Sequence, residues 1–183
     1  IAFDAYHTPK QVNDWLKEVA SANSKFARLH KIAVSPGGQP VNILELGPET
    51  GKKKKSLPAI LVVANMEGTV PIASEAALFL VKSLVEKPGQ REKVTWYILP
   101  QGNPDAAWNY FKKPLRLDNR NNRPHNDDMD DRTDEDGVED LDGNGIITMM
   151  RVKHPEGRWI PVPGEPRLMK KANGLKGEKG LYK

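Results

Sequence analysis

A dense run of acidic residues between Asp127 and Asp142 is the part of this chain whose composition points most clearly to chemistry. It holds ten carboxylates and one arginine. Like charges at this density repel, so the run is either a solvated loop or a set of oxygen ligands for a hard cation such as Ca²⁺. The spacing favours the cation, because Asp140, Asp142 and Asn144 stand at alternate positions before Gly145. This is the order of ligands and turn glycine in a calcium loop.

A complete calcium cage needs more ligands than this loop supplies. Arg151 occupies the position at which a helix–loop–helix calcium site carries its bidentate Glu. A second run of alternating oxygens lies upstream and is the expected source of the missing ligands: Asn126, Asp128, Asp130, Asp134 and Asp136. We expect linked cages in which calcium neutralises the repulsion and orders the loop. The alternative is a solvated acidic turn without a metal.

The net charge of +4 is distributed unevenly along the chain. The acidic run carries ten acids and one base, giving −9, and the remainder carries 27 bases and 14 acids, giving +13. The lysines at 52–55 have no aromatic residue among them. Nucleic-acid surfaces combine the two residue types, so we expect no nucleic-acid partner. The absence of cysteine excludes disulfides, thiolate zinc sites and cysteine nucleophiles.

The location of the protein is inferred from its terminus, its apolar runs and the calcium interpretation. No apolar run approaches the length of a membrane-spanning helix, and no signal-peptide pattern follows Ile1. A cleaved signal would leave no trace in a mature chain. Because free calcium is more available outside the cytoplasm, the calcium interpretation indicates a periplasmic or secreted protein.

The hydrophobic pattern predicts an α/β core. Thr8 is an N-cap followed by proline at the first helical position, and it begins a helix predicted over 9–22. A second helix is expected at 71–84, and strands are expected at 26–34, 41–46, 58–64 and 94–99. The last two strands flank the second helix as continuous apolar runs. This βαβ pattern indicates a doubly wound, mostly parallel sheet.

The second half of the chain has a weaker pattern. From 101 to about 140 it is polar and lacks a clear period, which is too long for an ordinary connection and indicates a functional or disordered loop. A short hairpin is predicted between 146–152 and 158–162. The segment 168–183 has few apolar residues, so we expect it to be poorly ordered.

Ligands of an open α/β sheet bind beyond the carboxyl ends of its strands, and the turn at that place is distinctive. It reads Ala64-Asn65-Met66-Glu67-Gly68-Thr69-Val70-Pro71, and Asn103-Pro104-Asp105 follows the next strand. Downstream of the acidic run the chain reads GNGIITMMRV from 143 to 152. In this order, over residues 58–169, the segments resemble the zinc carboxypeptidase family, the carboxypeptidase A-like metallopeptidases. The last segment resembles an insertion in a bacterial subgroup.

The resemblance implies that residues 1–183 form the amino-terminal portion of one carboxypeptidase-like domain, with 101–157 as a long loop and calcium-binding insertion. It implies zinc as the cofactor and hydrolysis of the C-terminal bond of a peptide or a peptidoglycan-like peptide. It also implies a partner, the remaining carboxy-terminal segment of the same domain. In the family that segment supplies an Asn-Arg pair, the third zinc ligand and the general-base Glu.

This chain departs from the family at the zinc-ligand motif. The family's first ligand, a His, is replaced by Glu67, and its second, a Glu, by Val70. Val70 cannot ligate a metal, whereas a catalytic zinc needs three protein ligands. We therefore expect a degenerate zinc position and no hydrolysis by this chain alone. The alternative for Glu67 is a partly buried carboxylate that accepts N–H groups of the turn.

Arginines of the long loop are the expected substrate-binding groups, because a guanidinium forms paired hydrogen bonds with a carboxylate. Arg120 is the first choice and Arg116 the second, while Arg123 is expected to pair with the acidic run. Among the four histidines, His125 is the candidate for a site role. The neighbouring aromatic residues either line a pocket for an apolar side chain or anchor the loop on the core: Trp108, Tyr110 and Phe111.

Two further functions are compatible with these residues. One is a non-catalytic protein that binds a peptide or glycan-peptide in a cleft that lost its metal. The other is a docking domain in which the calcium loops form the partner surface. The βαβ pattern argues against the docking domain, because calcium-loop docking repeats are small and have no sheet.

Overall fold

The computed structural model describes residues 1–49, 57–115, 117–126, 129–134, 139–140, 143–147 and 150–183. The chain divides into two compact units, Ile1–Ile146 and Ile147–Lys183. Among the described residues, no helix is long and apolar enough to cross a membrane.

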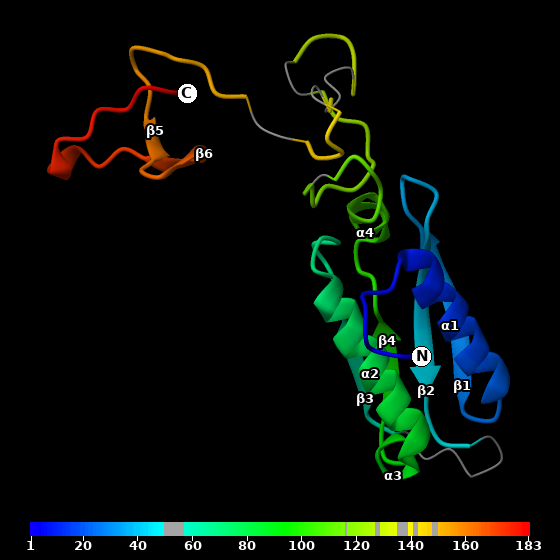
Figure 1. Cartoon of the computed structure of the whole chain (residues 1–183). Helices are drawn as coiled ribbons and strands as arrows, with labels where there is room; N and C mark the ends of the chain where they lie inside the picture. Colours follow the sequence, from blue (N-terminus) through cyan, green and yellow to red (C-terminus); the bar gives the residue numbers. More distant parts are fainter. Residues whose placement is uncertain (50–56, 116, 127–128, 135–138, 141–142, 148–149) are drawn as a thin grey trace. The chain divides into compact units, whose positions relative to one another are not determined.

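The first unit is built on a four-stranded sheet (Figure 1). Its elements in chain order are α1 (Pro9–Ala22), β1 (Ala27–Val34), β2 (Pro40–Leu46), β3 (Ala59–Val63), α2 (Pro71–Glu86), α3 (Pro88–Arg91), β4 (Thr95–Leu99) and α4 (Pro104–Tyr110). The predicted helices and strands of this unit all occur within two residues of their expected bounds. Helices α3 and α4 were not predicted, and α4 lies inside the segment expected to be a long loop.

Helix α1 begins where the sequence predicts because Thr8 caps it. The Thr8 hydroxyl accepts the Gln11 N–H at 3.4 Å, and the Gln11 side-chain oxygen accepts the Thr8 N–H at 2.8 Å. This reciprocal pair is a capping box, which satisfies two N–H groups at the helix start. The helix then buries Val12 and Leu16 against the sheet.

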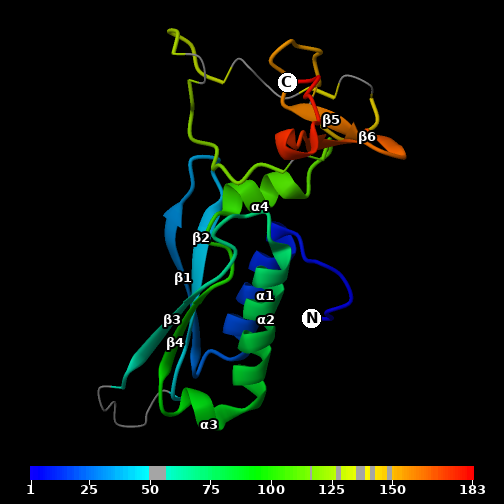
Figure 2. The same ribbon diagram turned by 90° about the vertical axis from the view of Figure 1, so that its left-hand side faces the viewer.

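The sheet has the order β1-β2-β4-β3 and mixed strand directions. The β1–β2 and β2–β4 pairs are antiparallel, and the β3–β4 pair is parallel. The short turn at 35–39 joins β1 directly to β2, a connection that gives an antiparallel pair, whereas α2 supplies the crossover that a parallel pair needs. The predicted α/β class is confirmed. A mostly parallel, doubly wound sheet is not confirmed. Two of the three strand pairs are antiparallel, and in the described part of the chain α1 and α2 cover the same face of the sheet, whereas a doubly wound sheet has helices on both faces (Figure 2).

The hydrophobic core lies between that sheet face and the two helices. Leu16 of α1, Leu78 of α2, Leu44 of β2 and Ile98 of β4 are all fully buried there. Successive side chains of a strand point to opposite faces, so the residues between these core positions lie on the second face of the sheet.

The second face is apolar and open along β3 and β4. Leu61 pairs with Tyr97 there, and Val63 pairs with Leu99. Leu61 is 63% exposed. Strand β3 is the last strand in the order of the described sheet, so its outer edge is unpaired in the described part of the chain. The first unit therefore has both an open apolar face and an open edge.

The second unit contains an antiparallel hairpin, in which β5 (Trp159–Val162) pairs with β6 (Glu165–Lys171). The short 3₁₀ helix η1 (Gly174–Lys176) follows. The strand predicted at 158–162 is confirmed as β5, but its hairpin partner is β6 and not the segment 146–152, of which 148–149 lie outside the described residues. The expected poor order of 168–183 is wrong, because part of that segment forms β6. The sequence pattern does not reveal β6, since its residues are mostly polar and backbone hydrogen bonds to β5 hold it.

Candidate functional site

The turn that follows β3 is shaped by a buried asparagine. Asn65 has a φ of 49°, a left-handed conformation that Asn adopts more readily than most residues. Its Oδ1 accepts the Val70 N–H at 3.1 Å, and its Nδ2 donates to the Gly68 carbonyl at 3.3 Å and to Ser74 Oγ at 3.1 Å. One side chain therefore fixes the turn and ties it to the first part of α2.

The turn also packs tightly against the start of α4. Gly68 has a φ of +73°, and a Cβ built on it would lie 2.4 Å from the Ala106 Cβ. The Gly102 N–H donates to the Ala64 carbonyl at 2.8 Å, and the Asn103 N–H donates to the Asn65 carbonyl at 3.2 Å. The carboxyl ends of β3 and β4 thus form one block, the place where an α/β sheet presents a ligand site.

Glu67 and Val70 together offer only one side chain that could bind a metal, the carboxylate of Glu67. Glu67 is exposed, and Val70 is 37% exposed and has no ligand atom. Within the described residues no three His, Cys, Asp or Glu side chains gather as a metal site. The alternative prediction for Glu67, a partly buried carboxylate bonded by the turn, is wrong, because Asn65 takes that role. The residues present do not fit a catalytic zinc.

Two of the four histidines are engaged elsewhere in the first unit. Nδ1 of His7 lies 2.9 Å from a carboxylate oxygen of Glu75, and Nε2 of His30 lies 2.8 Å from one of Glu45. His125 and Asp134 are linked through the backbone: the Asp134 N–H donates to the His125 carbonyl at 2.9 Å.

A fully buried carboxylate, Asp105, anchors the loop that carries the candidate arginine. Asp105 accepts the Ser35 hydroxyl at 2.5 Å, the Gly37 N–H at 3.1 Å and the Asn122 N–H at 3.0 Å. It joins α4, the β1–β2 turn and the loop after α4. Sequence reasoning identified the Asn-Pro-Asp motif but assigned Asp105 no role, because its donors come from distant parts of the chain.

Two asparagines of α4 and its cap hold the same loop. Asn103 Nδ2 donates to the Asn119 carbonyl at 2.8 Å, and Asn109 Nδ2 donates to Asn122 Oδ1 at 2.8 Å. Arg120 is exposed on this loop and forms a two-point pair with Asp118, with Nε and Nη2 each within 3.2 Å of one carboxylate oxygen. Arg120 therefore reaches solvent with a carboxylate beside it. Arg116 lies outside the described residues.

The described part of the acidic run forms turns closed by its own side chains. The Asp140 carboxylate accepts the N–H groups of Asn144 at 3.1 Å and Gly145 at 2.8 Å. The Asn126 Oδ1 accepts the Met129 N–H at 2.6 Å. These contacts close backbone turns and do not test the calcium cage, which stays a prediction. The remaining described candidates are exposed, Asp130 and Asp134, and three lie outside the described residues: Asp128, Asp136 and Asp142.

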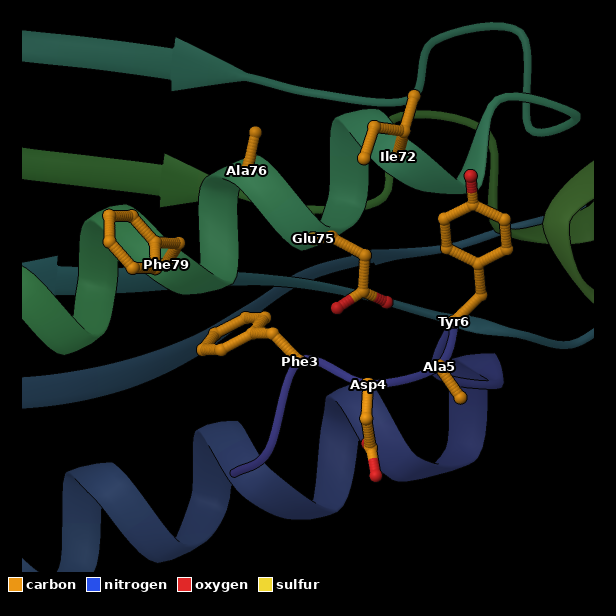
Figure 3. A pocket seen from close by; sticks show the side chains of 8 residues that line it. All are labelled: Phe3, Asp4, Ala5, Tyr6, Ile72, Glu75, Ala76 and Phe79. Atoms are coloured by element: carbon orange, nitrogen blue, oxygen red, sulfur yellow. The ribbon is translucent and has the colours of Figure 1, made fainter.

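A separate cavity lies between the amino-terminal segment and the outer side of α2. Its volume is about 490 Å³, and its apolar walls include Phe3, Tyr6, Ile72 and Phe79 (Figure 3). Figure 3 shows the Glu75 carboxylate pointing from α2 towards the amino-terminal segment, where His7 pairs with it. Glu75 is only 7% exposed. No residue of the predicted site lies in this cavity.

Comparisons with known proteins agree with the fold. The sequence profile described as "Zinc carboxypeptidase" matches residues 12–144. Mouse (Mus musculus) carboxypeptidase M is 29% identical over 108 residues, which cover 55% of this chain and 24% of the relative. Carboxypeptidase D of Drosophila melanogaster is 27% identical over 90 residues, 49% of this chain and 6% of the relative. The chain thus spans about a quarter or less of these relatives.

Solved structures show the same arrangement of elements. Bovine thrombin-activatable fibrinolysis inhibitor, in complex with tick carboxypeptidase inhibitor, has a TM-score of 0.58 at 20% identity, covering 68% of this chain and 40% of that one. Carboxypeptidase A from Helicoverpa armigera has a TM-score of 0.57 at 22% identity, covering 61% of this chain and 28% of that one. At these identities the likeness shows the fold alone.

Proposed function

The chain belongs to the zinc carboxypeptidase family, and from that membership we propose that it is part of a carboxypeptidase-like domain with a degenerate zinc position. The observation that carries the proposal is the turn after β3, which is ordered by Asn65 but presents Glu67 and Val70 where the family presents its first two ligands. A single oxygen ligand does not hold a catalytic zinc. Glu67 and Val70 therefore cannot supply metal-assisted hydrolysis on their own.

The test is peptidase activity in this chain and in any longer polypeptide that contains it. Synthetic peptides with aromatic, basic or acidic C-terminal residues would be incubated with added zinc, and release of the last residue followed by mass spectrometry. We expect no release that depends on zinc and disappears with a chelator. Zinc-dependent, chelator-sensitive release would refute the proposal.

A binding function is the second candidate, in which the domain retains a peptide C terminus without hydrolysing it. The exposed Arg120 on a loop held by Asn103 and Asp105 favours it, because a guanidinium is suited to a carboxylate. The Arg120 guanidinium already pairs with Asp118, so a peptide carboxylate would have to share the guanidinium with Asp118 or displace it. A fluorescent peptide with a free C terminus would bind, and its amidated form would bind at least tenfold more weakly. Equal binding of the two peptides would exclude carboxylate recognition.

The open face and edge of the first unit support a partner for the sheet. We propose that the carboxy-terminal continuation of the same domain covers Leu61 and Val63, since exposed apolar faces and strand edges promote association. Taken alone, the chain should self-associate in light scattering, and Leu61→Asp should reduce this. Leu117→Asp, a change at an exposed loop leucine, is the matched control. Equal association of both variants would contradict the proposal.

Calcium in the acidic run is proposed as a stabilising ion, on the strength of the alternating oxygen spacing. Isothermal titration should show calcium binding that Asp140→Asn weakens. Glu139→Gln, next in sequence but outside the alternation, should bind as the native chain does. The absence of binding heat in the native chain would refute it. The periplasmic or exported location rests on this calcium proposal.

A further inference from the structure

The second unit carries a surplus of positive charge. Residues 147–183 contain nine Lys or Arg and three carboxylates, all of which the structure describes. Each carboxylate pairs with one base of the unit: Glu156 with Lys183 at 3.3 Å, Glu165 with Arg167 at 2.7 Å, and Glu178 with Lys170 at 2.6 Å. The other six bases have no carboxylate of their own unit at salt-bridge distance in the described residues. The unit thus has a formal charge of +6.

Backbone pairing brings four side chains from separate segments into one row. Tyr182 pairs with Lys153 on one side and with Trp159 on the other, and Trp159 pairs with Lys171 across the β5–β6 hairpin seen in Figure 1. Directly paired residues of neighbouring strands point to the same face, about 5 Å apart. We call these four residues, in the order Lys153, Tyr182, Trp159, Lys171, the basic–aromatic row.

A third cation lies on the same face. The Arg151 guanidinium is 5.3 Å from the centre of the Tyr182 ring, and its Nη1 donates to the Pro166 carbonyl at 2.6 Å. Neither of these two partners is a carboxylate. Trp159 is 44% exposed, and both lysines of the row are exposed. The face thus combines three cations with an accessible indole.

We propose that the basic–aromatic row binds single-stranded nucleic acid, with a base stacked on Trp159 and phosphates against Arg151, Lys153 and Lys171. Single-strand surfaces combine stacking aromatics with cations that follow the backbone, and small antiparallel sheets present them well. An acidic peptide or a phosphate polymer would use the cations but give the exposed indole no role. The proposal is separate from peptide binding by the first unit.

This inference reverses the expectation that the chain has no nucleic-acid partner. That expectation considered the lysines at 52–55, which have no aromatic neighbours in sequence. The row joins residues that are 6 to 29 positions apart along the chain, and only backbone pairing places them together.

The test is fluorescence anisotropy of a labelled oligothymidylate of about 12 nucleotides with the full 183-residue chain, with an oligouridylate arm to separate DNA from RNA. We expect a Kd of about 10⁻⁴ to 10⁻⁶ M at physiological salt. With three phosphate contacts, log K should fall with log salt with a slope of about −2. Inorganic polyphosphate of equal charge should compete at least tenfold more weakly than unlabelled oligothymidylate.

Matched variants separate stacking from charge. Trp159→Leu should weaken binding about fivefold to a hundredfold, while Trp159→Phe should retain most of it, because the ring is what stacks. Lys171→Gln should reduce the salt slope by about 0.7. Lys176→Gln is the control, because Lys176 lies near Glu178, which pairs with Lys170. Lys170 precedes Lys171 in β6, so its side chain points to the face of the hairpin opposite the basic–aromatic row.

Circular dichroism of each variant would confirm that the unit stays folded. Three results would overturn the proposal: no oligonucleotide binding by the native chain, equal binding by folded Trp159→Leu, or equal competition by polyphosphate. The last result would assign the face to phosphate-rich polymers in general.

Discussion

The buried carboxylate of Asp105 is expected to contribute several kcal/mol to the free energy of unfolding of the first unit. It is fully buried and accepts three hydrogen bonds, from the Ser35 hydroxyl and from the N–H groups of Gly37 and Asn122. Hydrogen bonds to a charged group contribute about 1.5–3 kcal/mol each, and they are not additive. Because the three donors are partly accessible to water after the change, we expect Asp105→Ala to lower the free energy of unfolding by about 3–5 kcal/mol.

Urea denaturation followed by tryptophan fluorescence measures this effect. A loss of 3–5 kcal/mol lowers the midpoint by about 2 M urea if the m-value stays near 2 kcal/mol/M. Asp105→Asn keeps the volume and one acceptor, so we expect a smaller loss of about 2–3 kcal/mol. Asp14→Asn, a change at an exposed acid that pairs with Lys10 and Lys17, should shift the midpoint much less than either Asp105 variant, because exposed ion pairs contribute little to stability.

The same variant should loosen the loop held by Asp105. Limited proteolysis of Asp105→Ala should cleave within 117–123 faster than in the native chain, because the Asn122 N–H loses its acceptor. A change of less than about 1 kcal/mol in the free energy of unfolding would refute the assigned role of Asp105.

Three further predictions concern local contacts. Gly68→Ala should destabilise the chain by about 2–4 kcal/mol, since the new Cβ meets the first turn of α4. Gly38→Ala, at a glycine with similar φ but open space around it, should cost about 1 kcal/mol. Equal urea midpoints of the two variants would contradict the close packing at Gly68. Thr8→Ala should cost about 1 kcal/mol in the same assay through loss of the cap; an unchanged midpoint would contradict it. The pKa of Glu178 is lowered, first by its hydrogen bond with Lys170, so its contribution to stability is present above the ordinary pKa and is lost as pH falls through the lowered one. An NMR titration should show this pKa rising in Lys170→Gln, and no change would contradict the pair.

Local signals predicted the first unit well. Thr8 and the proline after it fixed the start of α1, because a cap and its partner lie within one turn. The apolar runs located β3 and β4, and the helix between them predicted the parallel β3–β4 pair. The antiparallel β2–β4 pair was not predicted, because the sequence pattern does not say which strands become neighbours. The anchor at Asp105 was not predictable, because its donors Ser35 and Asn122 are distant in sequence.

The sequence located the turn after β3 but did not identify the residue that orders it. The turn after β3 was identified from its residues, and the structure shows Asn65, rather than Glu67, bonded within it. Strand β6 was missed because its sequence is mostly polar and includes a proline. The basic–aromatic row was missed for a related reason, since cross-strand pairing leaves no periodic signal in the sequence.

The most direct test of the degenerate zinc position is the zinc content of the purified chain after dialysis against zinc-containing buffer, measured by elemental analysis. The double variant Glu67→His/Val70→Glu, which restores the family's ligand types in the turn, serves as the matched comparison. We predict no stoichiometric zinc in the native chain and an increase in the double variant. One zinc ion per native chain, lost on substitution of Glu67 by Ala, would contradict the account.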